Sequence, residues 1–233
     1  MKICVLGNSQ TASLKNCWSD LSSYYPDVEL TFFSSRLDGL KNFRLVNRFL
    51  IPQNDNLLKS ILFTSGGLDR VDIDAFDCFL LYGLQISVLS LDNRHSVSLK
   101  RQTYIDYLSK SLSIKLCKDI ISVKDVPVYL GCNPQKAEAP QKILPRVNEL
   151  NYFESFDLLK SNLDIKQAVV VPQPKETLLN EWYTEHGFSI GSTRLDIGDD
   201  MSGQLHPDHD LWHMNSKFGK LWLVNFFRLL KKF

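Results

Sequence analysis

Short runs of consecutive apolar residues recur along the chain, and segments with helical spacing separate several of them. A continuous apolar run of this length is typical of a strand that is covered on both faces. We expect five such strands, at residues 3–6, 28–33, 77–82, 126–130 and 169–171. We expect helices at residues 11–20, 97–117 and 221–233. This alternation predicts an α/β fold with a mostly parallel five-stranded sheet and helices on both of its faces.

Residues 37–73 fit this alternation less well, and we interpret them as an insertion. Within them, residues 44–51 and 57–64 could form either helices or a hairpin. Residues 133–145 contain three prolines and are the best candidate for a long loop. The chain has 233 residues, 44% of them hydrophobic, which is enough to bury one substantial core. We therefore expect a single domain over residues 1–233.

The charge balance is nearly neutral, with 27 basic and 26 acidic residues and a formal net charge of +1. No global field would draw such a protein to nucleic acid, so we expect no nucleic-acid partner. The five cysteines are scattered and form no C-x-x-C pair, and no apolar run approaches a membrane span or a signal-peptide core. These features favour a reducing, cytoplasmic location.

The final segment is apolar and carries Arg228, Lys231 and Lys232. Such a segment could lie on a membrane surface. The favoured interpretation is a last helix that docks on the sheet, because basic residues near its C-terminal end interact favourably with the helix dipole.

The first strand runs directly into a small polar turn, Gly7 to Gln10 (GNSQ), and a helix follows at once. In open α/β sheets the carboxyl ends of the strands border the ligand crevice, and the first amides of the next helix point donors into it. The turn therefore places Ser9 at the mouth of the expected crevice.

Three histidines and two aspartates lie within residues 206–213. If the segment were helical, His209 and His213 would share a face, as zinc ligands do. No second cluster is visible to complete a tetrahedral set, so we predict no metal and no other cofactor. The alternative is acid–base chemistry, because Asp210 can turn back to His213, accept its Nδ1 proton and leave Nε2 free as a base.

The two polar segments together supply a hydroxyl, an imidazole and a carboxylate. A serine hydroxyl is a weak nucleophile until a base removes its proton, and a histidine oriented by a carboxylate is the usual base. Because the first and last loops of a doubly wound sheet can meet at one crevice, Ser9, His213 and Asp210 are the predicted catalytic residues.

The first segment (GNSQ) and the last, Asp210 to His213 (DLWH), resemble the first and last blocks of the SGNH/GDSL hydrolases. In that family the first block carries the nucleophilic serine and the last is Asp-x-x-His. The resemblance implies a flavodoxin-like three-layer α/β/α fold. It also implies hydrolysis or transfer of acyl groups, often acetyl groups on sugars.

The resemblance further implies three donors for the oxyanion that forms when the serine attacks. They are the Ser9 amide, a glycine after the second strand and an amide side chain after the third. Gly39 is the candidate glycine, with Gly67 as its rival. Gln85 stands where the family has asparagine, and its extra methylene moves the amide hydrogens outward.

Each candidate residue also has a structural interpretation. Ser9 could cap the first helix, Asp210 could cap the last one, and Gln85 could be a satisfied polar residue at a strand end. Asn8 and Gln173 are the predicted substrate-binding residues, with Lys175 also near the pocket. His206 and His209 are expected at the pocket rim or in a loop, His95 and His186 at the surface, and the four tryptophans in the core.

These observations predict an SGNH-type serine esterase. Its substrate would be an O-acyl ester, such as an O-acetyl ester, of a carbohydrate, and a transferase would differ only in passing the acyl group to a sugar hydroxyl. The alternative from another class is a non-catalytic flavodoxin-like module that binds a sugar or a protein partner. In that case Ser9 would act only as a helix cap and anion donor.

Overall fold

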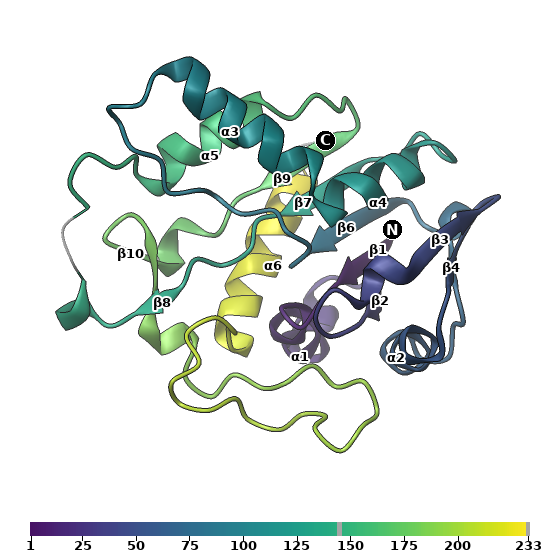
Figure 1. Ribbon diagram of the computed structural model, residues 1–233. Coiled ribbons are helices and arrows are strands. Elements are labelled where there is room, and N and C mark those ends of the chain that lie inside the picture. Colours follow the sequence, from purple (N-terminus) through teal and green to yellow (C-terminus); the bar gives the residue numbers. More distant parts are fainter. Residues whose placement is uncertain (144–145, 232–233) are drawn as a thin grey trace.

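The computed structural model describes residues 1–143 and 146–231 (Figure 1). Its main sheet has five strands: β1 (Lys2–Gly7), β2 (Glu29–Ser34), β6 (Cys78–Tyr82), β7 (Val128–Gly131) and β9 (Ala168–Val171). All neighbouring strands are parallel, and their order is β2-β1-β6-β7-β9. Counted along the chain this is the 2-1-3-4-5 order of flavodoxin-like folds. All five predicted strands are confirmed.

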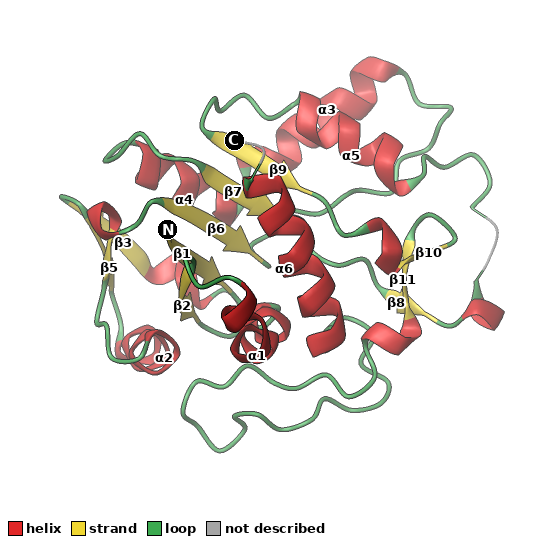
Figure 2. Ribbon diagram, turned by 180° about the vertical axis from the view of Figure 1, so that it is seen from behind, coloured by secondary structure: helices red, strands yellow, loops and turns green. Residues whose placement is uncertain are grey.

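Helices cover both faces of this sheet. One face carries α1 (Thr11–Leu21) and α6 (Ser216–Leu230), which lie in front of the strands in Figure 2. The other face carries α2 (Asp55–Ser65), α3 (Val97–Ser109), α4 (Leu112–Ile121) and α5 (Tyr152–Ser161). Because side chains alternate along a strand, Ile3 and Val5 pack toward α1 and α6, while Cys4 and Leu6 pack in the other core. The predicted three-layer α/β/α arrangement is confirmed.

Two of the predicted helices have different limits in the structure. The segment 97–117 forms two helices, because the chain breaks at Ser111, whose hydroxyl donates to Gln85 O at 2.9 Å. The last helix begins earlier than predicted, at Ser216, and the side chain of Asn215 caps it by accepting from the amides of Lys217 and Phe218. Its apolar side docks on the sheet, and the predicted end at Phe233 lies outside the described residues.

The first and last helices approach each other closely at their N-terminal ends. A Cβ atom at Gly219 would lie 2.0 Å from Ser13 O, so only glycine permits this contact. Ser13 is in the first turn of α1, and Gly219 is in the first turn of α6. The segments that precede the two helices are therefore held side by side, although about 200 residues separate them in the sequence.

The insertion contains one hairpin and one helix. Strands β3 (Phe43–Val46) and β4 (Phe49–Pro52) pair antiparallel, so the hairpin alternative is correct for residues 44–51. Residues 57–64 belong to α2. A short strand, β5 (Val71–Asp72), pairs with β4 and completes a three-stranded sheet.

Three short strands form another sheet. They are β8 (Ala137–Glu138), β10 (Leu178–Leu179) and β11 (Tyr183–Glu185). Strand β8 lies within the predicted loop 133–145, of which Leu144 and Pro145 lie outside the described residues. Six 3₁₀ turns complete the described structure: η1 (Ser22–Tyr24), η2 (Gly39–Asn42), η3 (Ile73–Ala75), η4 (Pro140–Lys142), η5 (Lys175–Thr177) and η6 (His186–Phe188). None of the helices in the described ranges combines the length and the apolar character needed to cross a membrane.

Candidate active site

The turn that carries Ser9 is held tightly between β1 and α1. A Cβ atom at Gly7 would lie 2.2 Å from Thr11 Cγ2 and 2.4 Å from Tyr82 O, so a larger residue would displace the turn. Asn8 closes the turn, since its backbone carbonyl accepts from the Thr11 amide at 3.0 Å and its side chain accepts from the Gln10 amide at 3.0 Å. Ser9 is thereby fixed at the carboxyl end of β1 with its side chain partly exposed.

The structure brings Ser9, His213 and Asp210 into one chain of hydrogen bonds. Ser9 Oγ lies 3.0 Å from His213 Nε2, and His213 Nδ1 lies 2.9 Å from Asp210 Oδ2. The other carboxylate oxygen, Asp210 Oδ1, accepts from the backbone amides of Trp212 at 2.9 Å and His213 at 3.0 Å. The segment therefore folds back on itself, as the Asp-x-x-His spacing predicts.

The electrostatics of Asp210 fix the direction of these hydrogen bonds. Burial alone would raise the pKa of the carboxyl group, but the amides of His213 and Trp212 and the His213 ring outweigh it and lower the pKa to about 2. The carboxylate is ionised at neutral pH and can only accept, so a neutral His213 carries its proton on Nδ1. Nε2 then faces the Ser9 hydroxyl as an acceptor, which is the arrangement that a general base requires.

A second imidazole, His206, joins the site. Its Nδ1 lies 3.1 Å from the same oxygen, Asp210 Oδ2, and its ring stacks on that of His213 with centroids 3.9 Å apart and 9° between the planes. His206 was expected only at the pocket rim or in a loop, without a role in the triad. The spacing of four residues to Asp210 is a signal that could have suggested this contact.

Gln10 provides a further link between the two segments. Its Nε2 donates to Trp212 O at 3.0 Å, which ties the first turn to the residue before His213. The sequence gives no signal for this role of Gln10, because a single contact from a side chain to the backbone leaves no sequence pattern.

Neither capping interpretation holds. The N-cap of α1 is Gln10, and no side chain caps that helix. Asp210 does not cap α6, which begins at Ser216 and is capped by Asn215. The Ser9 hydroxyl and the Asp210 carboxylate are therefore free to interact with His213.

The predicted oxyanion donors differ in whether their amide hydrogens already have an acceptor in the protein. Across the described residues, the Ser9 amide has no hydrogen-bond partner. The Gly39 amide already donates to Arg36 O at 3.3 Å. Its rival Gly67 follows the C-cap residue of α2, and its amide donates to Leu62 O at 2.7 Å, a shorter bond than that of Gly39.

Gln85 lies in the loop after β6 with a positive φ of 62°. Its Oε1 accepts from the Leu112 amide at 3.1 Å, so the side chain also supports the start of α4. Its Nε2 has no hydrogen-bond partner within the described ranges. The loop adjoins the nucleophile turn, since a Cβ atom at Gly83 would lie 2.2 Å from Asn8 Oδ1.

The two predicted substrate-binding residues, Asn8 and Gln173, make contacts within the protein. Asn8 packs against Gly83 and holds the turn. Gln173 is fully buried, its Oε1 accepts from the Gln135 amide at 2.8 Å, and its Nε2 donates to Thr177 Oγ1 and Thr184 Oγ1, both at 2.9 Å. With both amide hydrogens used, the Gln173 side chain is not available to a ligand.

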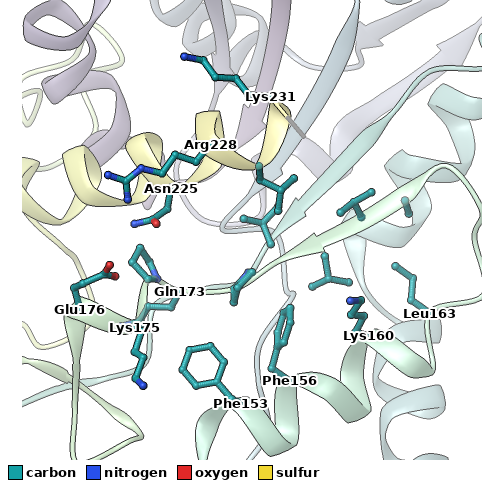
Figure 3. A pocket seen from close by; sticks show the side chains of 17 residues that line it. Phe153, Phe156, Lys160, Leu163, Gln173, Lys175, Glu176, Asn225, Arg228 and Lys231 are labelled. Atoms are coloured by element: carbon teal, nitrogen blue, oxygen red, sulfur yellow. The ribbon is translucent and has the colours of Figure 1, made fainter. Parts of the chain in front are cut away.

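Lys175 and the backbone around Gln173 line a different hollow, a groove of about 1040 Å³ between α5 and α6 along β9 (Figure 3). Phe153 and Phe156 form part of one wall, and Asn225 and Arg228 form part of the other. In the described part of the chain, the lining of this groove includes none of Ser9, Asp210 and His213. The expectation that Lys175 and Gln173 line the pocket beside Ser9 is therefore wrong.

The tryptophans also differ from one another. Trp182 and Trp222 are buried, as expected, but Trp212 is 58% exposed. Its backbone carbonyl is bound by Gln10 and its backbone amide by Asp210, so the backbone of Trp212 is fixed between the two segments of the site. The expectation of a core position is wrong for Trp212.

The geometry does not match a zinc site in which His209 and His213 share a helix face. The segment 206–213 is not helical, and His209 is exposed, so His209 and His213 do not form the expected pair. One atom of each of His206, Asp210 and His213 that could bind a metal ion lies within 4.8 Å of the other two. Both Nδ1 atoms are, however, within hydrogen-bond distance of Asp210 Oδ2, and His213 Nε2 faces Ser9. This arrangement is that of an acid–base network.

The cysteines offer no competing nucleophile. All five are buried and unpaired. Burial raises the pKa of Cys17, Cys78, Cys117 and Cys132 to about 12, so these thiols stay protonated at neutral pH.

No family model matches the sequence, and no curated protein matches it. Solved structures with a similar fold include a carbohydrate esterase whose active site is described as having divergent catalytic and non-catalytic binding functions (12% identity, TM-score 0.45). The whole chain is covered in that comparison, and it spans 65% of the esterase's length.

Two further structures are similar. One is a Bacteroides fragilis protein provisionally described as an acylhydrolase, with 11% identity over 99% of this chain and 86% of that one, and a TM-score of 0.45. The other is the periplasmic domain of a lipopolysaccharide acetyltransferase of Salmonella ser. Paratyphi A, with 13% identity over 98% and 83% of the two chains and a TM-score of 0.49. Similarity at this level concerns the fold and carries no information on the substrate.

Proposed function

We propose that the protein is a serine hydrolase of the SGNH type that hydrolyses or transfers an acyl group. The observation that carries this proposal is the chain of contacts from Ser9 Oγ to His213 Nε2 (3.0 Å) and from His213 Nδ1 to Asp210 Oδ2 (2.9 Å). A hydroxyl, an imidazole and an ionised carboxylate in this order form the unit that activates a serine.

In the proposed reaction, Ser9 Oγ attacks the ester carbonyl while His213 Nε2 takes the hydroxyl proton. The tetrahedral intermediate collapses when His213 returns that proton to the leaving alcohol, and an acyl group remains on Ser9. Water then attacks the acyl-enzyme with His213 as base, which releases the acid and restores Ser9. In a transferase, a second alcohol takes the place of water.

The oxyanion that forms in each step needs donors directed at the carbonyl oxygen. The Ser9 amide, which has no partner in the described structure, is the first proposed donor. Gln85 Nε2 is the second, because its Oε1 is bound by the Leu112 amide and its two hydrogens have no partner among the described residues. Gly39 could contribute only if its 3.3 Å bond to Arg36 O opened.

The proposed substrate is an O-acyl ester of a carbohydrate, such as an O-acetyl ester. The exposed Trp212 supports this choice, because it directly precedes the base His213 in the chain and an exposed indole can pack against the apolar face of a sugar. The proposal that the acyl group is small rests only on the resemblance of the two sequence segments to the SGNH hydrolases, which often act on acetyl groups.

The test is covalent labelling with a fluorophosphonate probe, followed by peptide mass spectrometry. We expect labelling of Ser9 in the wild-type protein and none in Ser9→Ala. Ser98→Ala is the matched control, since Ser98 is an exposed serine of α3. Assays with 4-nitrophenyl acetate, with and without sugar acceptors, would then separate hydrolysis from transfer. Failure of Ser9 to react would favour the non-catalytic binding module.

A further inference from the structure

We infer that His206 is a positioning residue for the Ser9–His213–Asp210 triad, which holds Asp210 and the His213 ring through one hydrogen bond and one stacking contact. This inference rests on the proposed function of the site, but its central test does not depend on activity. Three observations carry it: the shared carboxylate oxygen, the stacked rings and an unpartnered buried nitrogen.

The first observation is that two imidazoles converge on one oxygen. Asp210 Oδ2 lies 2.9 Å from His213 Nδ1 and 3.1 Å from His206 Nδ1, while Asp210 Oδ1 is occupied by two backbone amides. A carboxylate oxygen has two lone pairs, so it can accept from both rings. A second donor fixes the carboxylate orientation and takes up part of its negative charge, which weakens its pull on the His213 proton.

The second observation is the stacking of the rings, 3.9 Å apart and 9° from parallel. The contact fixes the plane in which His213 can turn, and hence the direction in which Nε2 meets Ser9.

The third observation concerns the charge state of His206. Its side chain is only 7% exposed, and in the described structure its Nε2 has no hydrogen-bond partner. Burial lowers the pKa of His206 to about 4, with further lowering by His213, Arg194 and Arg36 against the opposing effect of Asp210. The ring is then neutral near pH 7 with its proton on Nδ1, which explains why Nε2 needs no acceptor.

The primary test is the protonation of the wild-type protein, measured by long-range ¹H–¹⁵N correlation of the imidazole nitrogens. We expect His206 to be neutral at pH 7, with its proton on Nδ1 and none on Nε2, and to remain so down to about pH 5. A charged His206 at pH 7, or a proton on Nε2, would overturn the inference. An inactive protein would leave this readout intact, so failure of the proposed function is distinguishable.

Two variants separate the hydrogen bond from the ring. His206→Phe keeps a stacking ring and removes the donor, while His206→Asn keeps a donor near the Nδ1 position and removes the ring. We expect His206→Phe to move the protonation midpoint of His213, and the acid limb of kcat/KM, upward by about half a pH unit to one unit, the size of one lost hydrogen bond. His206→Asn should stay within about 0.2 units of the wild type.

The control is His209→Phe, an exposed histidine of the same segment, which should change neither quantity. An unchanged midpoint in His206→Phe, or an equal shift in His206→Asn, would contradict the inference, because loss of packing alone does not distinguish the two variants in this way. If either variant does not fold, the wild-type measurement still decides.

Discussion

Two hydrogen-bonded networks join distant parts of this chain, and they differ in what they leave open. The Ser9 network consists of Ser9, His213, Asp210 and His206. The Gln173 network consists of Gln173, Gln135, Thr177, Thr184 and Tyr152. The first meets solvent at the carboxyl end of β1, whereas the second is centred on a fully buried amide.

The two networks differ in how completely their hydrogen-bonding groups are paired and in the charge that they carry. In the Gln173 network both hydrogens of the side-chain amide have acceptors. The backbone amide of Gln173 donates to the Tyr152 hydroxyl at 2.8 Å. In the Ser9 network a carboxyl pKa is lowered to about 2, an imidazole pKa is lowered to about 4, and a buried nitrogen has no described partner. Complete pairing of neutral groups stabilises a fold, while displaced pKa values in an accessible cluster indicate chemistry.

The largest effect is expected for Asp210→Asn. The asparagine amide group would face His213 Nδ1 and favour the tautomer with its proton on Nε2, which cannot take the Ser9 proton. We expect kcat to fall by about 10³- to 10⁴-fold in a 4-nitrophenyl acetate assay, with nearly unchanged stability. Asp208→Asn, at an exposed position of the same segment, is the control. Retention of activity within about tenfold would show that the carboxylate does not orient His213.

Gln173→Leu should produce the opposite outcome. It leaves the Gln135 amide and two buried threonine hydroxyls without the side chain that joins them, so we expect the free energy of unfolding to fall by about 3 kcal/mol. Urea denaturation measures this change, and Lys175→Ala, on the exposed rim of the groove, is the control. Activity per folded molecule should stay unchanged. A selective loss of activity would assign Gln173 to the active site after all.

Gln85 combines the properties of the two networks. The oxygen of its side-chain amide supports α4, and the nitrogen is available to a ligand. Gln85→Glu keeps an oxygen for the Leu112 amide and removes the hydrogens proposed to bind the oxyanion. We expect kcat to fall by about tenfold to a hundredfold while the melting temperature stays within about 2 °C. Gln85→Met, which loses both functions, should lower both quantities. Full activity of Gln85→Glu would limit Gln85 to a structural role.

The sequence predicts the parts of this molecule that depend on local pattern. All five strands of the main sheet follow from continuous apolar runs, and the fold of the 210–213 segment follows from an Asp-x-x-His spacing that lets the carboxylate reach the amides two and three residues further on. The meeting of Ser9 and His213 follows from the parallel sheet, because loops at the same edge converge.

Contacts that depend on packing between segments could not be predicted. Ser111 breaks the helix expected over 97–117 because its hydroxyl meets a carbonyl in the loop after β6. Gln173 lies at the expected strand end, yet its direction is set by Thr177 and Thr184, whose positions no local pattern reveals. His206 joins the triad because a turn stacks it on His213, and stacking has no sequence period.

The smallest expected effect is a difference between the two networks in how the free energy of unfolding depends on pH. The pKa of His206 is lowered from 6.5 to about 4 by burial, with His213 adding to the effect, so the unfolded chain takes up a proton at higher pH than the folded protein does. The contribution of His206 to the free energy of unfolding is therefore fully present above pH 6.5 and is lost as the pH falls toward 4. The slope is at most about 1.4 kcal/mol per pH unit, and solvent screening reduces it.

His206→Asn lacks this titration, so its stability should approach that of the wild type as the pH falls from 6.5 to 4. Gln173→Leu removes no group that titrates in this range, and burial keeps the pKa of Tyr152 well above its usual value, so this variant should stay below the wild type by a constant amount. Urea midpoints measured every half unit of pH would show converging curves in the first case and parallel curves in the second. Parallel curves for His206→Asn would mean that the pKa of His206 is the same in the folded and the unfolded protein, and the contrast between the two networks would then rest on the triad alone.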